Sequence, residues 1–221
     1  FDCVEDQMYQ IVGYYICERI PIPGWLHRSG TMLSVSGCFG GIHPRLDTCF
    51  SQNDYIAPEE REGYKTRWGL NEERAGKLVA EIGALMGKGL AEDGRFTRLD
   101  DAHYFYESYF SNGQCILASL STTEEYFEML QREMVPAGPG TGSLLPGVPD
   151  ENELLGFDIL GWDICSFHSF LCNSLYEMLP GVRFNHYGLL EHTFEEAAVF
   201  SDRIQGYGEP VLWVPCRIGK C

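Results

Sequence analysis

The chain has 221 residues, of which 44% are hydrophobic and 13% aromatic, so it is long and apolar enough to bury a core and is not disordered as a whole. Its 32 acidic and 16 basic side chains give a formal net charge of -16, which disfavours nucleic acid and anionic membranes as partners and favours a basic one. No run of eighteen apolar residues is present, and acids lie among the first residues, where a signal peptide would be basic. We therefore expect a cytoplasmic protein without a membrane segment.

The first part of the chain alternates regular segments with loops. Apolar residues at helical spacing predict a helix over residues 4–19, which a Pro-Ile-Pro-Gly sequence ends. A short strand is expected at 31–36, before a glycine-rich loop. Residues 48–68 are polar and are expected to run over the surface. Asn71 is predicted to cap a helix that continues to about residue 90.

A strand followed by a helix is predicted in the middle of the chain. Residues 114–120 have the continuous apolar character of a buried strand. Thr122 and Glu125 have the spacing of a capping box, which predicts a helix that runs through residue 133.

A Pro- and Gly-rich segment at 135–149 is the best candidate for an internal boundary or a long loop, since it holds four prolines and four glycines. It would separate an N-terminal region, 1–134, from a C-terminal region, 150–221; the alternative is a single domain. The C-terminal region is the more acidic, because ten acids between residues 150 and 202 face one arginine, Arg183.

The C-terminal region predicts a strand at 154–164, a helix at 167–179 and a closing strand at 210–218. Thr193 and Glu196 form a second capping box, which predicts a helix that ends near residue 204. The two boxed segments are similar enough to suggest a duplication. The sequence therefore predicts an α+β fold with a mixed or antiparallel sheet and packed helices, and two similar α/β subdomains are compatible with it.

Two cysteines and a histidine, Cys165, His168 and Cys172, lie at intervals of three and four residues among large aromatics. Their spacing is compatible with zinc on one helix, but a structural zinc site needs four ligands and no second pair stands out. We favour a half-buried position for all three, with His168 bonded to a backbone carbonyl or a carboxylate. The nine cysteines form no Cys-x-x-Cys pair and are interpreted mainly as reduced, buried side chains, so neither metal nor cofactor is expected.

Besides a Cys-His nucleophile in the stretch 165–172, two clusters are catalytic alternatives, since the usual phosphate, hydrolase-elbow and metalloprotease motifs are missing. Cys38 and His43 share a glycine-rich loop whose backbone amides could face an oxyanion, which would suit a hydrolase or transferase. Asp100, Asp101 and His103 could act in acid–base chemistry, although we favour solvated acids at the start of an element.

The C-terminal third contains LLGFDILGWDICSFHSFLCNSL, FNHYGLLEHTFEEAAVFSDRI and EPVLWVPCRI. In these segments the chain resembles small cytoplasmic bacterial proteins of the toxin-immunity type. The resemblance implies a non-enzymatic acidic protein that occludes a cognate toxin, and it carries no catalytic residue.

The charge pattern leads to the same hypothesis, a binding protein that neutralises a basic protein partner, with a toxin as the candidate. Acidic side chains would accelerate association, and aromatic anchors such as Trp162, Phe167 or Tyr187 would supply affinity. The predicted contact residues are Asp158, Trp162, Asp163, Tyr187, Glu191, Glu195 and Glu196. The alternatives are the Cys/His-dependent enzyme and a DNA-mimic inhibitor, which would need carboxylates at the spacing of phosphates. The sequence leaves the oligomeric state open.

Overall fold

The computed structural model describes residues 9–22, 30–36, 58–91, 93–111, 115–134, 153–163 and 166–221. The strands are β1 (Tyr9–Glu18), β2 (Ile20–Pro21), β3 (Thr31–Met32), β4 (Cys115–Thr123), β5 (Glu153–Asp163), β6 (Ser166–Ser169) and β7 (Trp213–Lys220). The helices are α2 (Pro58–Trp68), α3 (Glu72–Leu85), α4 (Leu99–Phe105), α5 (Glu124–Glu133) and α6 (Phe194–Ile204), with a π-helical turn η2 (Tyr106–Phe110) and a 3-10 helix η3 (Leu175–Met178).

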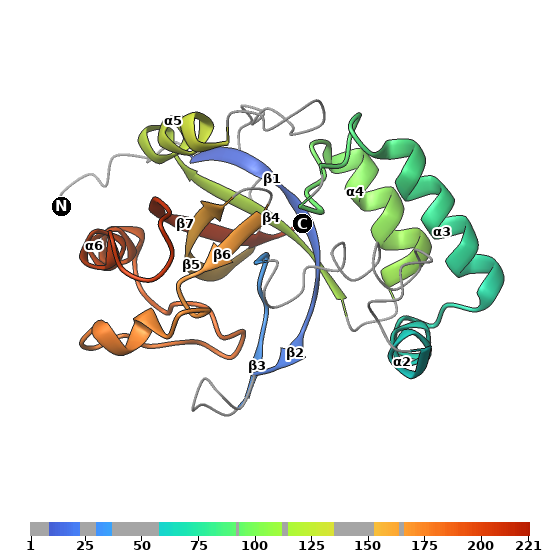
Figure 1. Ribbon diagram of the computed structural model, residues 1–221, viewed down its shortest axis with the longest axis horizontal. Helices are drawn as coiled ribbons and strands as arrows, with labels where there is room; N and C mark the ends of the chain where they lie inside the picture. The colour runs from blue at the N-terminus through green and yellow to red at the C-terminus, as the bar shows by residue number, and fades with distance from the viewer. Residues whose placement is uncertain are drawn as a thin grey trace.

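The main sheet has five strands in the order β1-β4-β7-β5-β6, and every neighbouring pair is antiparallel. It curls strongly (Figure 1), and β2 and β3 form a separate two-stranded sheet. The fold is therefore α+β, as the sequence predicts. Because β4 pairs with β7, strands from both sides of residues 135–149 share one sheet. That Pro- and Gly-rich segment itself lies outside the described residues.

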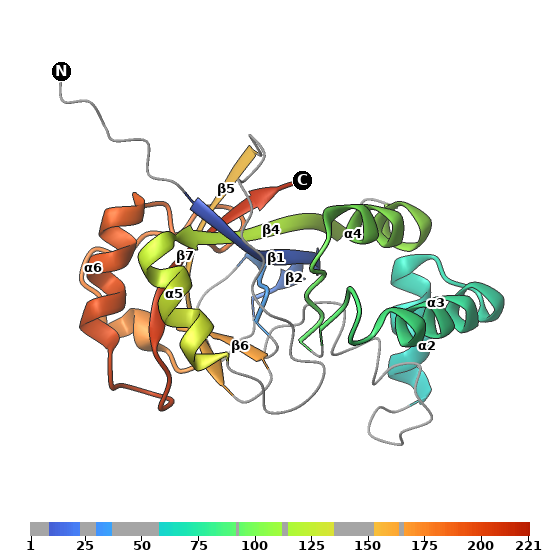
Figure 2. The same cartoon turned by 90° about the horizontal axis from the view of Figure 1, so that it is seen from above.

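The helices form two groups around this sheet. α2, α3 and α4 lie together at one end, whereas α5 and α6 lie at the other (Figures 1 and 2). One core cluster joins α5 to β1, β4 and β7, a second joins α3 and α4 to β1 and β4, and a third joins α6 to β5 and β7. None of the described helices is both long and apolar enough to cross a bilayer.

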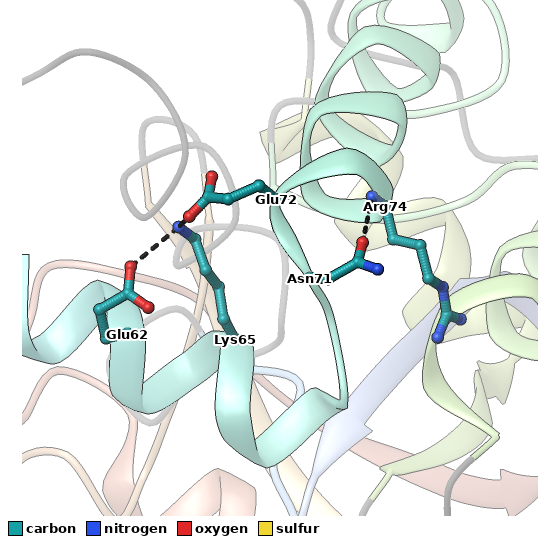
Figure 3. A network of polar contacts seen from close by, with 5 residues as sticks. All are labelled: Glu62, Lys65, Asn71, Glu72 and Arg74. Atoms are coloured by element: carbon teal, nitrogen blue, oxygen red, sulfur yellow. Dashed lines mark hydrogen bonds and ion pairs between the residues drawn. The ribbon is translucent and has the colours of Figure 1, made fainter.

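The corner between α2 and α3 shows how local polar contacts fix the first helical group (Figure 3). Lys65 Nζ donates to Glu62 Oε1 at 2.9 Å and also to the Glu72 carboxylate, which ties the end of α2 to the start of α3. Asn71 Oδ1 accepts from the Arg74 amide at 2.9 Å, so the predicted N-cap of α3 is confirmed. Part of the polar stretch expected to run over the surface is thus helix α2, which ends at the buried Trp68.

The helix predicted over residues 4–19 is wrong, because residues 9–18 form strand β1. Tyr15 belongs to the first core cluster and Ile16 to the second, so consecutive side chains pack on opposite faces, as in a strand. The outer edge of β1 is also covered, since Tyr14 and Phe96 exchange both backbone hydrogen bonds. A strand buried on both faces is apolar throughout and lacks the alternation that identifies a half-buried strand.

The helix predicted over 167–179 is also wrong. Residues 166–169 form β6, which pairs with the end of β5 in a hairpin, and turns then lead into the short η3. Ser174 at the start of η3 has φ 54°, a left-handed conformation that a continuous helix excludes. At 31–36, the strand covers only Thr31–Met32.

The remaining predicted elements of the described chain are confirmed, namely β4, α5, β5, α6 and β7. The capping box of α6 is complete, because Thr193 and Glu196 bond each other's backbone amides. In α5 the N-cap is Thr123, one residue later than predicted. The Thr122 hydroxyl instead donates to the Pro215 carbonyl at 2.7 Å and joins β4 to β7.

Candidate functional site

Exposed acids gather on helices α5 and α6. The seven exposed carboxylates of the two helices, here called the α5–α6 acidic surface, are Glu124, Glu125, Glu128, Glu133, Glu195, Glu196 and Asp202. The exposed basic residues of these helices are Arg132 and Arg203. Four of the acids lie in the first turn of a helix, where the helix dipole favours negative charge. Their placement therefore follows from the same local signals that start the helices.

Aromatic rings connect the two helices into one surface. Phe194 of α6 contacts Tyr126 of α5 at a ring-centroid distance of 6.1 Å and Tyr9 of β1 at 5.4 Å. Burial, followed by the charges of Asp202 and Glu125, raises the pKa of Tyr126. Carboxylates from both helices thus lie near the Tyr126 ring, and their negative electrostatic potentials add there.

An apolar side chain lies among these acids. Val199 is 50% exposed, four residues after Glu195 and three before Asp202, which places all three on one face of α6. A surface that combines an aliphatic contact with flanking carboxylates suits lysine and arginine side chains, whose stems are apolar and whose ends are cationic.

The predicted contact residues divide by exposure. Glu191, Glu195 and Glu196 are exposed, as a contact surface requires. Glu196 is partly engaged within the protein, since the Thr193 amide and then His192 lower the pKa of its carboxyl.

Two of the three predicted aromatic anchors, Trp162 and Tyr187, are half-buried, whereas the third, Phe167, is buried and cannot contact a partner. Trp162 packs edge-on against Phe167, with ring centroids 5.1 Å apart. The Arg19 guanidinium lies 5.4 Å from the centre of the Tyr187 ring. Both rings therefore already have intramolecular contacts, and neither projects freely from the surface.

Asp158 cannot contact a partner, which corrects its assignment. It is 2% exposed, and its Oδ1 accepts from the Ser169 hydroxyl and from the Ile159 amide, each at 2.8 Å. Desolvation raises the pKa of the Asp158 carboxyl to about 7, against the two hydrogen bonds, which lower it. The acid lies in the interior of β5, where six neighbouring positions are buried too.

His168 of the predicted Cys-His cluster lies on strand β6 of the β5–β6 hairpin and not on a helix. Cys165 lies outside the described residues, and Cys172 Sγ lies 3.5 Å from the Ser36 hydroxyl. His168 Nδ1 lies 2.7 Å from Glu209 Oε2, and the His168 side chain is 17% exposed, so the predicted half-buried histidine with a carboxylate partner is confirmed.

Sequence reasoning missed Glu209 in this role and assigned Asp163 to a different one. Asp163, His168 and Glu209 place one possible ligand atom each within 4.8 Å of one another, and within the described part of the chain they are the one group of this kind. Asp163 could have been found from a hairpin reading of residues 161–169, since it precedes the turn. No local signal identifies Glu209, because it comes from a distant turn.

Cysteine thiols in the core are poor nucleophiles. Cys17, Cys115 and Cys216 are free and buried, as predicted for reduced core cysteines. Burial raises the pKa of Cys115 to about 12 and that of the other two thiols further. At neutral pH all three are therefore protonated and unreactive.

The second catalytic alternative lies in solvent. Asp100 and Asp101 occupy the first turn of α4, each with a carboxylate oxygen 3.8 Å from an Arg98 nitrogen, and His103 is exposed. This arrangement fits the interpretation of solvated acids at the start of an element. Cys38 and His43 lie outside the described residues.

A scan against protein-family models, a search of curated proteins and a search of solved structures found no match. The similarity to immunity proteins therefore stays a prediction, and the functional argument depends on the geometry of the described residues.

Proposed function

We propose that this protein is a non-enzymatic acidic binding protein of the cytoplasm that captures and neutralises a basic protein partner, as an immunity protein neutralises a toxin. The observation that carries the proposal is the α5–α6 acidic surface, where seven exposed carboxylates accompany two arginines. We propose that the partner binds these two helices and the neighbouring Glu191, rather than the β5 strand.

Electrostatic attraction explains the first step of such binding. Concentrated charge of one sign raises the association rate of an oppositely charged partner by about 10- to 1000-fold. At physiological salt this attraction is screened beyond a distance of about 8–10 Å. Arg132 lies 3.6 Å from Glu128 and offsets the charge of that carboxylate. Glu195 and Asp202 lie next to the exposed Val199, and no salt bridge of either acid is seen among the described residues. These two acids are therefore the best positions at which to test the surface.

Specific affinity needs desolvated contacts in addition to charge. Val199 supplies exposed apolar area between Glu195 and Asp202, and Tyr126 lies partly buried beside Asp202. A lysine or arginine of the partner would cover Val199 with its methylene groups and pair with the carboxylates at its end.

The test begins with affinity capture of a basic partner on this protein. The captured protein is then purified, and its association rate is measured by stopped-flow fluorescence at several salt concentrations. The double variant Glu195→Lys/Asp202→Lys changes the α5–α6 acidic surface. The matched control, Glu73→Lys/Glu107→Lys, makes the same change in net charge at the other end of the molecule, and Glu73 occupies the second position of α3 as Glu195 does in α6.

The proposal predicts that the α6 variant lowers the association rate at least tenfold and weakens the salt dependence, while the control changes the rate less than threefold. Equal losses in both variants would show that net charge alone attracts the partner and would overturn the assignment of the surface. An association rate that does not respond to salt would overturn the electrostatic mechanism.

A further inference from the structure

Three potential metal ligands meet near the turn end of the β5–β6 hairpin. Their ligand atoms all lie within 4.8 Å of one another, and His168 Nδ1 lies 2.7 Å from Glu209 Oε2. Asp163 is the third. The His168 and Glu209 side chains are 17% and 28% exposed, so the cluster is largely shielded yet open to a small ion.

The fold brings these residues together from three segments. Asp163 ends β5 and His168 lies on β6, in a register that pairs Gly161 with His168. Gly161 also pairs with Trp213 at the start of β7, so it lies between the two strands. A Cβ atom on Gly161 would approach Val211 Cγ2 to 2.2 Å, which shows that the turn carrying Glu209 packs directly on the glycine.

The charge of the cluster favours a cation. Two carboxylates and one imidazole carry a net charge of -1 even when the imidazole is protonated. A divalent ion would displace that proton and neutralise both carboxylates, which a single shared proton cannot do.

We propose that Asp163, His168 and Glu209 bind a divalent metal ion of the Zn²⁺ or Co²⁺ type, with water in the remaining positions. One imidazole and two carboxylates are ligands that these ions accept. Metal–ligand distances of about 2.0–2.2 Å hold tetrahedral donors about 3.3–3.6 Å apart, which lies between the 2.7 Å that separates His168 from Glu209 and the 4.8 Å limit on all separations in the cluster. The site goes beyond the proposed partner binding and does not depend on it.

Binding would join the hairpin to the turn before β7. The amide nitrogen of Asn173 lies against Gly208, the residue before Glu209, and it is buried without a hydrogen-bond acceptor among the described residues. A buried donor without an acceptor therefore lies beside the turn that carries Glu209, where an added oxygen atom, such as that of a water, would satisfy it.

The test is a titration of the full chain with Co²⁺, followed by the visible d–d absorption of the bound ion. Asp163→Asn removes one ligand but leaves the His168–Glu209 pair, so it separates loss of the metal from loss of the fold. Glu209→Gln and His168→Gln remove the other two ligands. His103→Gln is the matched control, since His103 is an exposed histidine on α4.

The proposal predicts one saturable Co²⁺ per chain and no thiolate charge-transfer band. Each of the three ligand variants should weaken binding at least tenfold, and His103→Gln less than threefold. Absence of saturable binding, a thiolate band, or weakening below threefold in Asp163→Asn would each overturn the assignment. Far-UV circular dichroism of every variant checks that the comparison is made between folded proteins.

Discussion

The buried carboxyl of Asp158 makes folding stability depend on pH in an unusual direction. Its pKa is about 7 in the folded protein and 3.8 in an unfolded reference, so the folded state holds the proton more tightly. Between these two values the folded protein binds more protons than the unfolded chain does, and stability must fall as pH rises. Asp158 therefore adds most to the stability of the folded state below about pH 4. This contribution is lost as the pH rises to about 7, and it does not change further above that pH.

The size of the effect follows from the shift. A rise of roughly three pKa units corresponds to about 4 kcal/mol, at 1.36 kcal/mol per unit. Because Asp158 is buried, solvent does not reduce this free energy as it would for a carboxyl at the surface. Denatured-state structure and water penetration would lower the measured value.

Asp158→Asn isolates this contribution, because the amide keeps the Oδ1 acceptor for Ser169 and for the Ile159 amide but cannot ionise. We expect the variant and the native protein to differ little in free energy of unfolding near pH 4.5. The free energy of unfolding of the variant should rise relative to that of the native protein by about 3 kcal/mol between pH 4.5 and pH 8, because about 1 kcal/mol of the total is already lost at pH 4.5. Urea unfolding at half-unit intervals of pH, followed by tryptophan fluorescence, measures the difference.

Asp202→Asn is the control, since Asp202 is exposed on α6 and its variant should show a difference that is flat between pH 5 and 8. A flat difference for Asp158→Asn as well would refute the reasoning, because Asp158 would then be ionised or neutral throughout the range. A difference that falls with pH would show that a cation stabilises the Asp158 carboxylate.

Three further changes test the local architecture. Thr193→Ala removes the acceptor of the capping box and should cost about 1 kcal/mol in urea unfolding; no loss would mean that the box contributes nothing to α6. Gly161→Ala brings a methyl group against Val211 and should destabilise the protein by about 1–3 kcal/mol, whereas an unchanged midpoint would show that the turn moves freely. Cys17 and Cys216 should resist iodoacetamide at pH 8 until urea is added, and peptide mass spectrometry would expose rapid native labelling as a contradiction.

The elements that could be predicted from sequence carry signals with a local mechanism. The box of Thr193 and Glu196 fixes the start of α6 wherever the helix packs, and Asn71 does the same for α3. β1 could not be predicted in this way, because burial on both of its faces removes the polar alternation that distinguishes a strand. The short β6 owes its conformation to pairing with β5, which is a tertiary contact.

The candidate sites were predictable only where chemistry follows from a single segment. A carboxylate does lie beside His168, but the identity of Glu209 depends on the turn that packs on Gly161, 48 residues earlier in the chain. Asp158 was placed at the surface because it is charged. Its position inside the apolar run of β5 was the available sign that it is buried.

The acidic residues of this chain therefore have different physical effects. Asp158 is buried and near its pKa at neutral pH, so it acts on stability and contributes little to the field outside the protein. Asp163 and Glu209 are half-buried beside an imidazole, where a divalent ion would cancel their charge. Fully exposed acids, such as those on α5 and α6, are the ones that would steer the basic partner proposed above. Because the three groups respond to different variables, pH, metal and salt should each perturb one group, and variants of one should leave the responses of the other two unchanged.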